Sequence, residues 1–329
     1  MSNSKIVALA KKREVARISA PLKQRNLWSD AFRRLLRNRL SMIGFFIFAL
    51  FLMMAILGPI LAPYPYMLQD LNAVAQPPSA AHWMGTDDLG RDFFSRILWG
   101  AQTAAIVAFA STFSSLLLGM IIGSAAAFVG GLLDWGASRL TDVIMAVPDI
   151  LFASLLAATV REPVGQWVEE MYIRTGFSFL KTTTYVDFIV VFSALSFVHW
   201  TGYARLIRGQ ILSLREKEYV EAARMVGVKG LAILVRHVVP NALGPILVSV
   251  TFGFAGAIVA ESSLSYLGIG VQPPQASWGA MINDNALSWR YRPWLTIIPG
   301  MVVGIVSLAI NFLGDGLMDA LNPRQAGRA

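Results

Sequence analysis

The sequence predicts an all-α polytopic membrane protein with six transmembrane helices. Of its 329 residues, 55% are hydrophobic and only 15% are charged, and the mean hydropathy is +0.56. A soluble domain could not bury this much apolar surface. The apolar residues also fall in long runs, and a run of about 20 residues is enough to cross the hydrocarbon core of a bilayer.

The first 40 residues are basic and are predicted to lie in the cytosol. Eleven Lys and Arg residues precede Ser41, against only two acidic residues, Glu14 and Asp30. Residues 1–26 have the composition of a basic tail. They lack the apolar core and cleavage site of a removable signal peptide, so we expect no cleavage.

Residues 26–40 are predicted to form a helix that lies in the membrane interface. Trp28, Phe32, Leu35 and Leu36 fall on one helical face, and arginines occupy the others. Such a helix buries its apolar face at the acyl boundary and turns its basic face toward anionic headgroups.

Six apolar runs follow, and they define a predicted membrane domain over residues 41–325 with a short tail at 326–329. The first run has 22 residues without a charge. An even number of spans places both ends of the chain on one side. The predicted spans are about 41–62, 100–130, 138–160, 187–205, 239–261 and 293–315.

The distribution of positive charge predicts the orientation. With both ends in the cytosol, 21 of the 28 Lys and Arg residues lie on the cytosolic side, as the positive-inside rule requires. The net charge of +8 is therefore assigned to cytosolic flanks, and no nucleic-acid partner is expected. The chain has no cysteine, which excludes disulfides and thiolate chemistry.

The first external loop, residues 63–98, is predicted to end in the start of a helix. Asp87 or Asp88 is expected to cap that helix. Arg91 and Arg96 are expected to lie at the lipid headgroups.

Two carboxylates interrupt the third span. Asp142 and Asp149 are seven residues apart, about two helical turns, on nearly one face. Carboxylates inside a membrane are costly and are therefore functional candidates. Asp142 lies near the cytosolic end within reach of Arg139, which favours a helix-end role. Asp149, beside Pro148, is a candidate for lining a translocation cavity, and a structural role remains its alternative.

Residues 161–186 are predicted to form a second external loop of mixed charge. Its alternatives are a cap on the external vestibule, a contact for a binding protein, and a surface insertion. His199, near the end of the fourth span, is expected to be a hydrogen-bonded residue of the bundle rather than a proton relay.

Residues 212–238 form a polar, basic loop between long apolar segments. Tyr219, Ala222, Ala223 and Val226 recur at i, i+3, i+4 and i+7, which predicts a helix with one apolar stripe. Gly227 follows the last periodic residue and predicts the end of that helix. The stripe restarts at the same spacing with Leu231, Leu234, Val235 and Val238.

Pro240 can open the next helix from its first turn. The sequence therefore predicts a short helix-turn-helix on the cytosolic side. A solvated amphipathic linker with ordinary i,i+4 charge pairs, such as Lys217 with Glu221, is the alternative.

These residues resemble a known family. Glu-Ala-Ala at 221–223, Gly227 and Pro240 look like the cytoplasmic loop of permease subunits in binding-protein-dependent ABC importers. In that family the loop docks into a cleft of the ATPase subunit and carries its motion to the membrane. His237 stands where the general family has an aliphatic residue, and is similar to the peptide and nickel branch.

Three further stretches carry the resemblance. The segment 85–96, with Gly-Thr-Asp, Gly-Arg-Asp and Ser-Arg, resembles the oligopeptide, dipeptide and nickel permeases, specifically the C-type member of each permease pair. The run ESSLSYLGIGVQPPQASWG at 261–279 resembles the peptide and nickel permeases, and the C-terminal segment 311–324 is similar to the C-terminal signature of the family. In the last segment Met318 and Asn322 stand where the family pattern leads us to expect Arg and Asp.

The run at 261–279 also carries candidate pathway residues. Glu261 is predicted at the external edge of the fifth span as part of an outer gate, with Ser262 beside it. The alternative for Glu261 is a solvated helix end. Gly268 and Gly270 with Pro273-Pro274 predict a rigid external re-entry.

The resemblance implies the type I permease fold of ABC importers, in the inner membrane of a bacterium. It implies half of an alternating-access pathway for di- or oligopeptides, with nickel chelates and glutathione-like molecules left open. The expected partners are a homologous second permease, two cytosolic ATPase subunits that bind ATP and Mg²⁺, an extracytoplasmic substrate-binding protein, and membrane lipid. This chain itself is expected to bind no cofactor or metal and to catalyse no reaction, since it lacks a GxxxxGK[ST] loop and metal-ligand spacing.

Two other classes of function compete with this one. A proton-coupled secondary transporter would use Asp142, Asp149 and Glu261, but the inverted repeats of such transporters are not evident. A membrane enzyme would need a nucleophile paired with a base, and no such pair is evident.

Overall fold

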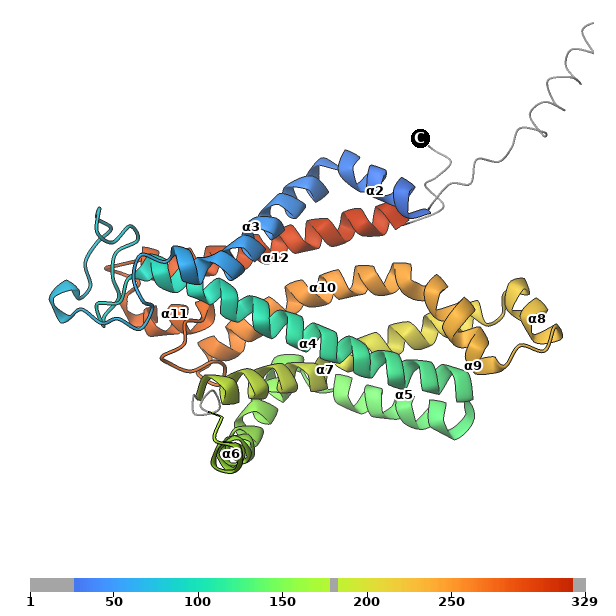
Figure 1. Cartoon of the computed structure of the whole chain (residues 1–329). Coiled ribbons are helices and arrows are strands. Elements are labelled where there is room, and N and C mark those ends of the chain that lie inside the picture. Colours follow the sequence, from blue (N-terminus) through green and yellow to red (C-terminus); the bar gives the residue numbers. More distant parts are fainter. Residues whose placement is uncertain (1–26, 178–182, 322–329) are drawn as a thin grey trace, which may run out of the picture.

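The computed structural model describes residues 27–177 and 183–321, and in these residues the chain is all-α, which confirms the predicted fold class (Figure 1). Strands are absent from the described ranges, where one isolated bridge joins Thr86 to Asp92. The basic tail and the C-terminal segment that includes Asn322 lie outside the described residues.

In the described part of the chain, five helices are long and apolar enough to cross a membrane, and a bent pair provides the sixth candidate. Most of them run roughly along one axis (Figure 1). The helices can be longer than the predicted apolar spans, because their ends include polar turns. The fourth predicted span ends at about residue 205, but its helix, α7, continues to Leu214. The five are α3 (Arg39–Leu61), α4 (Phe93–Val129), α7 (Thr183–Leu214), α10 (Val239–Tyr266) and α12 (Trp294–Leu321).

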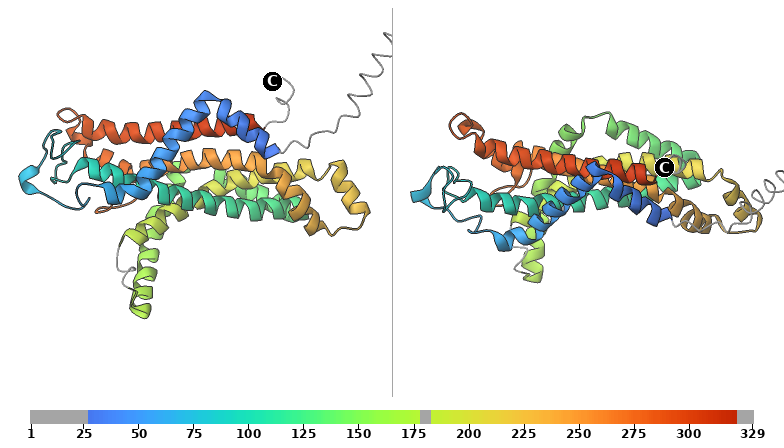
Figure 2. Two further views of the ribbon diagram at one scale, coloured as in Figure 1. Left: turned by 45° about the horizontal axis from the view of Figure 1, so that its top comes forward. Right: turned by 90° about the horizontal axis from the view of Figure 1, so that it is seen from above.

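The third predicted span is a bent pair of helices. α5 (Gly131–Met145) and α6 (Asp149–Thr175) meet at 92°. Pro148 lies at the break, where its missing amide hydrogen prevents an uninterrupted helix. α6 then stands away from the bundle axis (Figure 2). It continues through residues 161–175, so the prediction of a loop there is wrong.

Glycines allow neighbouring helices to pack at backbone distance. A Cβ on Gly119 of α4 would lie 2.5 Å from the Cβ of Tyr203 in α7. A Cβ on Gly123 would lie 2.5 Å from the carbonyl oxygen of Ala204. On the opposite side of the bundle, Gly44 of α3 meets the backbone of α12 in the same way.

A short helix precedes the first span. α2 (Leu27–Arg37) is followed by Asn38. The Asn38 side chain accepts hydrogen bonds from the amides of Leu40 and Ser41 and so caps α3. α2 packs against the end of α12, while Phe32 and Leu36 remain exposed. The interfacial role predicted for this helix stays a prediction.

The connection from α3 to α4, predicted to be external, differs from its prediction in two respects. The cap of α4 is Asp92, which accepts a 2.8 Å hydrogen bond from the amide of Ser95, and not Asp87 or Asp88. Asp87 instead binds the Arg91 guanidinium at 2.6 Å. The connection includes the turn η1 (Leu71–Ala73).

Arg91 and Arg96 are buried rather than placed at the headgroups. Arg96 Nε lies 3.8 Å from Asp87 Oδ2, and Arg91 Nη2 lies 3.3 Å from Asp284 Oδ2 at the end of α11 (Trp278–Asp284). The turn η4 (Ala286–Ser288) follows α11. Sequence reasoning could not predict the burial of Arg91 and Arg96, because their partner Asp284 is far away in the sequence and only the fold brings it near.

Tyr66 links this connection to the segment before α11. Its hydroxyl donates to Gln275 Oε1 at 3.1 Å, and its ring lies 4.4 Å from that of Trp99. Burial raises the pKa of Tyr66, and the nearby Arg96 charge opposes this shift to a lesser extent. The hydroxyl therefore stays protonated at neutral pH and can donate the bond.

Candidate coupling surface and translocation cavity

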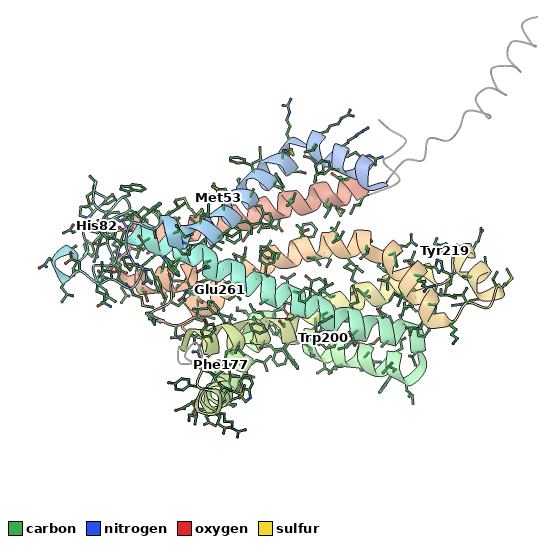
Figure 3. All side chains as sticks on the ribbon, in the orientation of Figure 1. Met53, His82, Phe177, Trp200, Tyr219 and Glu261 are labelled. Carbon is green, nitrogen blue, oxygen red and sulfur yellow. The ribbon has the colours of Figure 1, made fainter. Side chains whose placement is uncertain are left out.

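The polar loop between α7 and α10 folds into a projecting pair of short helices, here called the knob (residues 217–238). It contains α8 (Glu218–Met225), α9 (Gly230–Ile233) and the π-helical turn η3 (Leu234–Val238), which runs directly into α10. The knob lies at the end of the molecule opposite to the external connection, as Tyr219 and His82 mark in Figure 3. The predicted helix-turn-helix is present.

Gly227 makes the turn of the knob possible. Its φ is +84°, in the left-handed region that favours glycine. The Gly227 amide donates to the carbonyl of Arg224 at 2.9 Å, and the Val228 amide donates to that of Ala223 at 3.1 Å. These two bonds form a Schellman motif, which ends α8 where the sequence predicts.

A small apolar core attaches the knob to the body. Val220 is 0% exposed, and it shares a cluster of buried side chains with Ile207 and Ile211 of α7 and with Ile233 and Val238. Because both halves of the knob contribute to this cluster, the knob is fixed to α7 and α10 rather than tethered loosely.

The apolar stripe predicted on α8 is largely exposed. Val226 is 84% exposed and Met225 is 85% exposed. Glu221, His237 and Pro240 are also exposed, and Ala223 is half-buried. The remaining exposed apolar residues of the knob are Tyr219, Ala222, Val228, Leu231 and Val235.

Val220, which lies off the predicted stripe, anchors α8, while most of the stripe on α8 stays exposed in the isolated chain. In the restarted stripe, Leu234 and Val238 are buried. A monomeric soluble surface seldom exposes such a group of apolar side chains without a binding role. The knob therefore has the character of a docking surface for another protein.

Ion pairs beside the knob connect α5 to α7. Arg208 binds Asp134 with both arms of its guanidinium, one of them at 2.7 Å. Arg205 binds Asp142 at 2.7 Å. Arg215 donates to the carbonyl of Ala127 in α4 at 3.2 Å. The sequence reasoning missed Asp134 as a partner, because only the fold brings α5 next to α7.

A cavity of about 560 Å³ lies between α6, α7, α10 and α12. Asp149 and His199 both line it, together with apolar residues such as Phe252. The structure therefore brings Asp149 to a cavity, as the sequence suggested for this residue, although its role in a translocation path stays a prediction.

Glu261 is buried completely and is not a solvated helix end. Its Oε1 accepts hydrogen bonds from the hydroxyls of Ser265 at 2.9 Å and Ser277 at 2.8 Å. Ser262 is buried beside it, and its hydroxyl lies 3.4 Å from Oε2. Hydroxyl donors thus hold the Glu261 carboxylate beside residues 267–277, the segment predicted to form an external re-entry.

A second anchor holds the same re-entry from the outside. Arg161 of α6 donates to Asp187 of α7 and to the carbonyl of Gly270 at 2.7 Å. Asp187 Oδ2 also accepts a 3.0 Å hydrogen bond from the amide of Gln272. Sequence reasoning missed this cluster because Arg161 was assigned to a loop.

The carboxylates proposed for a proton relay are not assembled into one site. Asp142 pairs with Arg205, Asp149 lines the cavity, and Glu261 is enclosed by serine hydroxyls. Within residues 27–177 and 183–321, no group of three potential ligands among His, Asp and Glu could hold a metal ion.

Comparison with known proteins gives consistent matches over most of the chain. The family model described as "Binding-protein-dependent transport system inner membrane component" matches residues 115–327. The model described as "N-terminal TM domain of oligopeptide transport permease C" matches residues 26–78.

Individual relatives match along most of their length. The oligopeptide transport system permease protein OppC of Bacillus subtilis is 38% identical over 302 residues, which cover 92% of this chain and 91% of the relative. The dipeptide transport system permease protein DppC of Alkalihalophilus pseudofirmus is 35% identical and covers 90% of each chain. OppC of Escherichia coli is 33% identical and covers 91% of this chain and 92% of its own.

Proposed function

This chain belongs to the inner membrane components of binding-protein-dependent transport systems, and from that premise we propose that it forms half of the membrane pathway of an ATP-driven peptide importer. Relatives named as oligopeptide and dipeptide permeases, matched over 90–92% of their length at 33–38% identity, support peptides as the substrate. The choice between dipeptides and longer peptides stays open.

The observation that carries the proposal is the exposed apolar surface of the knob. Tyr219, Met225 and Val226 project from an element that Val220 fixes to the body. A docked ATPase covers these side chains, and its motion passes through α8 and α9 into α7 and α10. Glu221 and Ala222 lie on the exposed side of α8, where they contact the partner.

The remaining knob residues shape this surface. Ala223 and Gly227 form the turn through their backbone groups. His237 and Pro240 are exposed where η3 passes into α10, and the Asn241 side chain donates to the carbonyl of His237 at 2.6 Å. These residues fix the angle between the knob and α10, and so determine how a movement of the knob displaces α10.

The complete transporter contains a homologous second permease, two cytosolic ATPase subunits and an extracytoplasmic substrate-binding protein. ATP and Mg²⁺ are bound by the ATPases, and this chain contributes binding and movement only. ATP must bind one conformation of the assembly better than the other, because a ligand without differential affinity shifts no equilibrium.

The transporter lies in the bacterial inner membrane with both termini of this chain in the cytosol. The absence of native cysteine allows this orientation to be tested with single Trp83→Cys and Val226→Cys variants, whose positions are exposed at opposite ends. A membrane-impermeant maleimide should label the Trp83→Cys variant in spheroplasts, where the outer leaflet is accessible. It should label the Val226→Cys variant only in inverted vesicles from cells that lack the ATPase subunits, because a docked ATPase would cover this position. The reverse pattern would contradict the proposal.

Peptide uptake in vesicles tests the function. The complete wild-type transporter should take up a radiolabelled peptide when ATP is supplied inside and no proton gradient is present. Glu221→Lys should abolish this uptake and the co-purification of the ATPase while leaving the amount of inserted permease unchanged. Uptake driven by a proton gradient alone would favour a secondary transporter instead.

A further inference from the structure

The cavity between α6, α7, α10 and α12 combines a polar group of residues with an apolar lining. Its volume, about 560 Å³, lies in the range of roughly 300–1,000 Å³ that is typical of sites for small ligands. Apolar side chains form most of its wall. The polar residues on the wall are Asp149, His199, Ser263, Ser307 and Asn311.

Asp149 brings a carboxylate without an ion-pair partner to this cavity. It is exposed in the isolated chain, and within the described residues its side chain makes no ion pair or hydrogen bond. By contrast, Asp134, Asp142 and Asp187 each bind an arginine. Asp149 is thus available for a cationic ligand.

Asp149 is the first residue of α6, a position at which acidic residues are common in helices. Helix capping does not account for it, since Pro148 is the N-cap residue and no side-chain cap bond is present there. The Asp149 charge acts on His199, the other titratable residue of the wall.

A second polar feature points to a ligand with hydrogen-bonding groups. Ser307 is more than nine-tenths buried, and its hydroxyl has no hydrogen-bond partner within the described residues. A buried hydroxyl without a partner is costly, and most such groups bind water or a ligand. Asn311, one turn further along α12, adds an amide that can both donate and accept.

We infer that this cavity binds the positively charged α-amino group of the peptide, with Asp149 as its counter-ion and with Ser307 and Asn311 as partners for the peptide bond. The apolar wall accommodates the peptide side chains. This inference rests on the proposed function and adds a specificity-determining residue to it. A metal ion is a poorer occupant, because the cavity offers only one carboxylate and one imidazole.

The test uses the complete transporter in detergent without its binding protein, so that the external protein contributes no selectivity. The probe is a dipeptide with a free amino terminus and a C-terminal benzoylphenylalanine, which cross-links to nearby residues on illumination. Its N-acetylated form lacks the positive charge. The free peptide should cross-link to this chain, and the acetylated peptide should cross-link roughly tenfold less, as expected for the loss of one charged hydrogen bond.

Asp149→Asn should reduce cross-linking of the free peptide roughly tenfold and leave that of the acetylated peptide unchanged, while Asp149→Glu should retain most of it. Asp149→Ser serves as a second variant if Asp149→Asn does not assemble. Glu162→Gln, an exposed position on the same helix, is the matched control and should have no effect.

Equal cross-linking of both peptides, equal cross-linking in wild type and Asp149→Asn, or no cross-linking of the wild type would each overturn the inference. ATP-dependent uptake by the wild type with its binding protein is measured separately. Its failure would count against the proposed function, whereas failure of the cross-linking pattern alone would count only against the cavity.

Discussion

The hydroxyl of Ser277 lies 2.8 Å from Oε1 of Glu261 and donates a hydrogen bond to it, which joins the start of α11 to the last turns of α10. The Ser265 hydroxyl donates to the same oxygen and accepts from the amide of Val271 at 3.1 Å. One buried carboxylate therefore holds both ends of the external re-entry.

Removing this carboxylate should loosen the re-entry. Glu261→Ala leaves two buried serine hydroxyls without their acceptor, at a cost of roughly 1–3 kcal/mol. We expect a lower melting temperature of the detergent-purified transporter and faster proteolysis between residues 267 and 277. Glu261→Gln keeps an acceptor oxygen and should be milder. Glu162→Ala, on an exposed face of α6, should match the wild type, and equal stability of all variants would contradict this role.

Substitutions of two valines of α8 should distinguish the folding of the knob from the docking of the ATPase. Val220→Asp places a charge in the apolar cluster and should destabilise the knob by on the order of 3 kcal/mol. Val226→Asp changes an 84% exposed position and should alter the stability of the chain by less than about 0.5 kcal/mol. It should nevertheless weaken ATPase binding by about tenfold or more, because the charge would be buried in the interface.

Co-purification of the ATPase and thermal unfolding of the permease, measured on the same preparations, distinguish these effects. If Val226→Asp retained full ATPase binding and uptake, the exposed stripe could not be the docking surface.

Gly227 should tolerate few side chains. Gly227→Ala should cost about 1–2 kcal/mol, because the φ of +84° is strained for a residue with a Cβ. Gly227→Asn should be milder, since asparagine adopts this conformation more readily. Gly227→Pro should abolish transport without affecting insertion, because proline cannot adopt this φ and has no amide for the bond to Arg224.

The matched control is Gly209→Ala in α7, where the backbone is helical and a Cβ would meet open space. This change should leave transport intact. Uptake by Gly227→Pro at the wild-type rate would show that the turn has no part in coupling.

Arg161 and Asp187 should behave as a coupled pair. Arg161→Ala leaves the buried Asp187 without its cation and should destabilise the transporter by about 3 kcal/mol. Adding Asp187→Asn should recover much of this loss, because the uncompensated charge is then removed. Arg161→Lys keeps the charge but not the fork that binds Asp187 and Gly270 together, so it should be intermediate. Thermal unfolding of the wild type, Arg161→Ala, Asp187→Asn and the double variant gives the coupling energy, and a value near zero would exclude a structural pair.

Hydropathy runs predict most of the fold, because membrane helices must satisfy their backbone groups internally and be apolar over their length. Hydropathy runs did not predict the bend at Pro148 or the continuation of α6. Residues 161–175 have mixed charge, which suggests a loop when only apolar runs are counted. A usable signal was nevertheless present, since Glu170 and Arg174 form an i,i+4 pair of the kind found on exposed helices.

The candidate site was predictable in position more than in orientation. The spacing from Tyr219 to Val226 locates α8 correctly, but periodicity cannot say whether an apolar face is covered by the chain or by another protein. Burial of Val220 and exposure of Val226 depend on how α7 and α10 meet the knob. The burial of Arg96 is likewise invisible in local sequence, because its partner Asp284 belongs to another segment.

The glycine contacts between α4 and α7 also govern how the molecule responds to mutation. A methyl group at Gly119 or Gly123 would wedge the two helices apart. It would also displace the α7 arginines that reach across to α5. The positions least tolerant of change therefore include two that carry no functional group, and a screen for inactive variants would recover them alongside the knob, although they touch neither nucleotide-driven partner nor cargo.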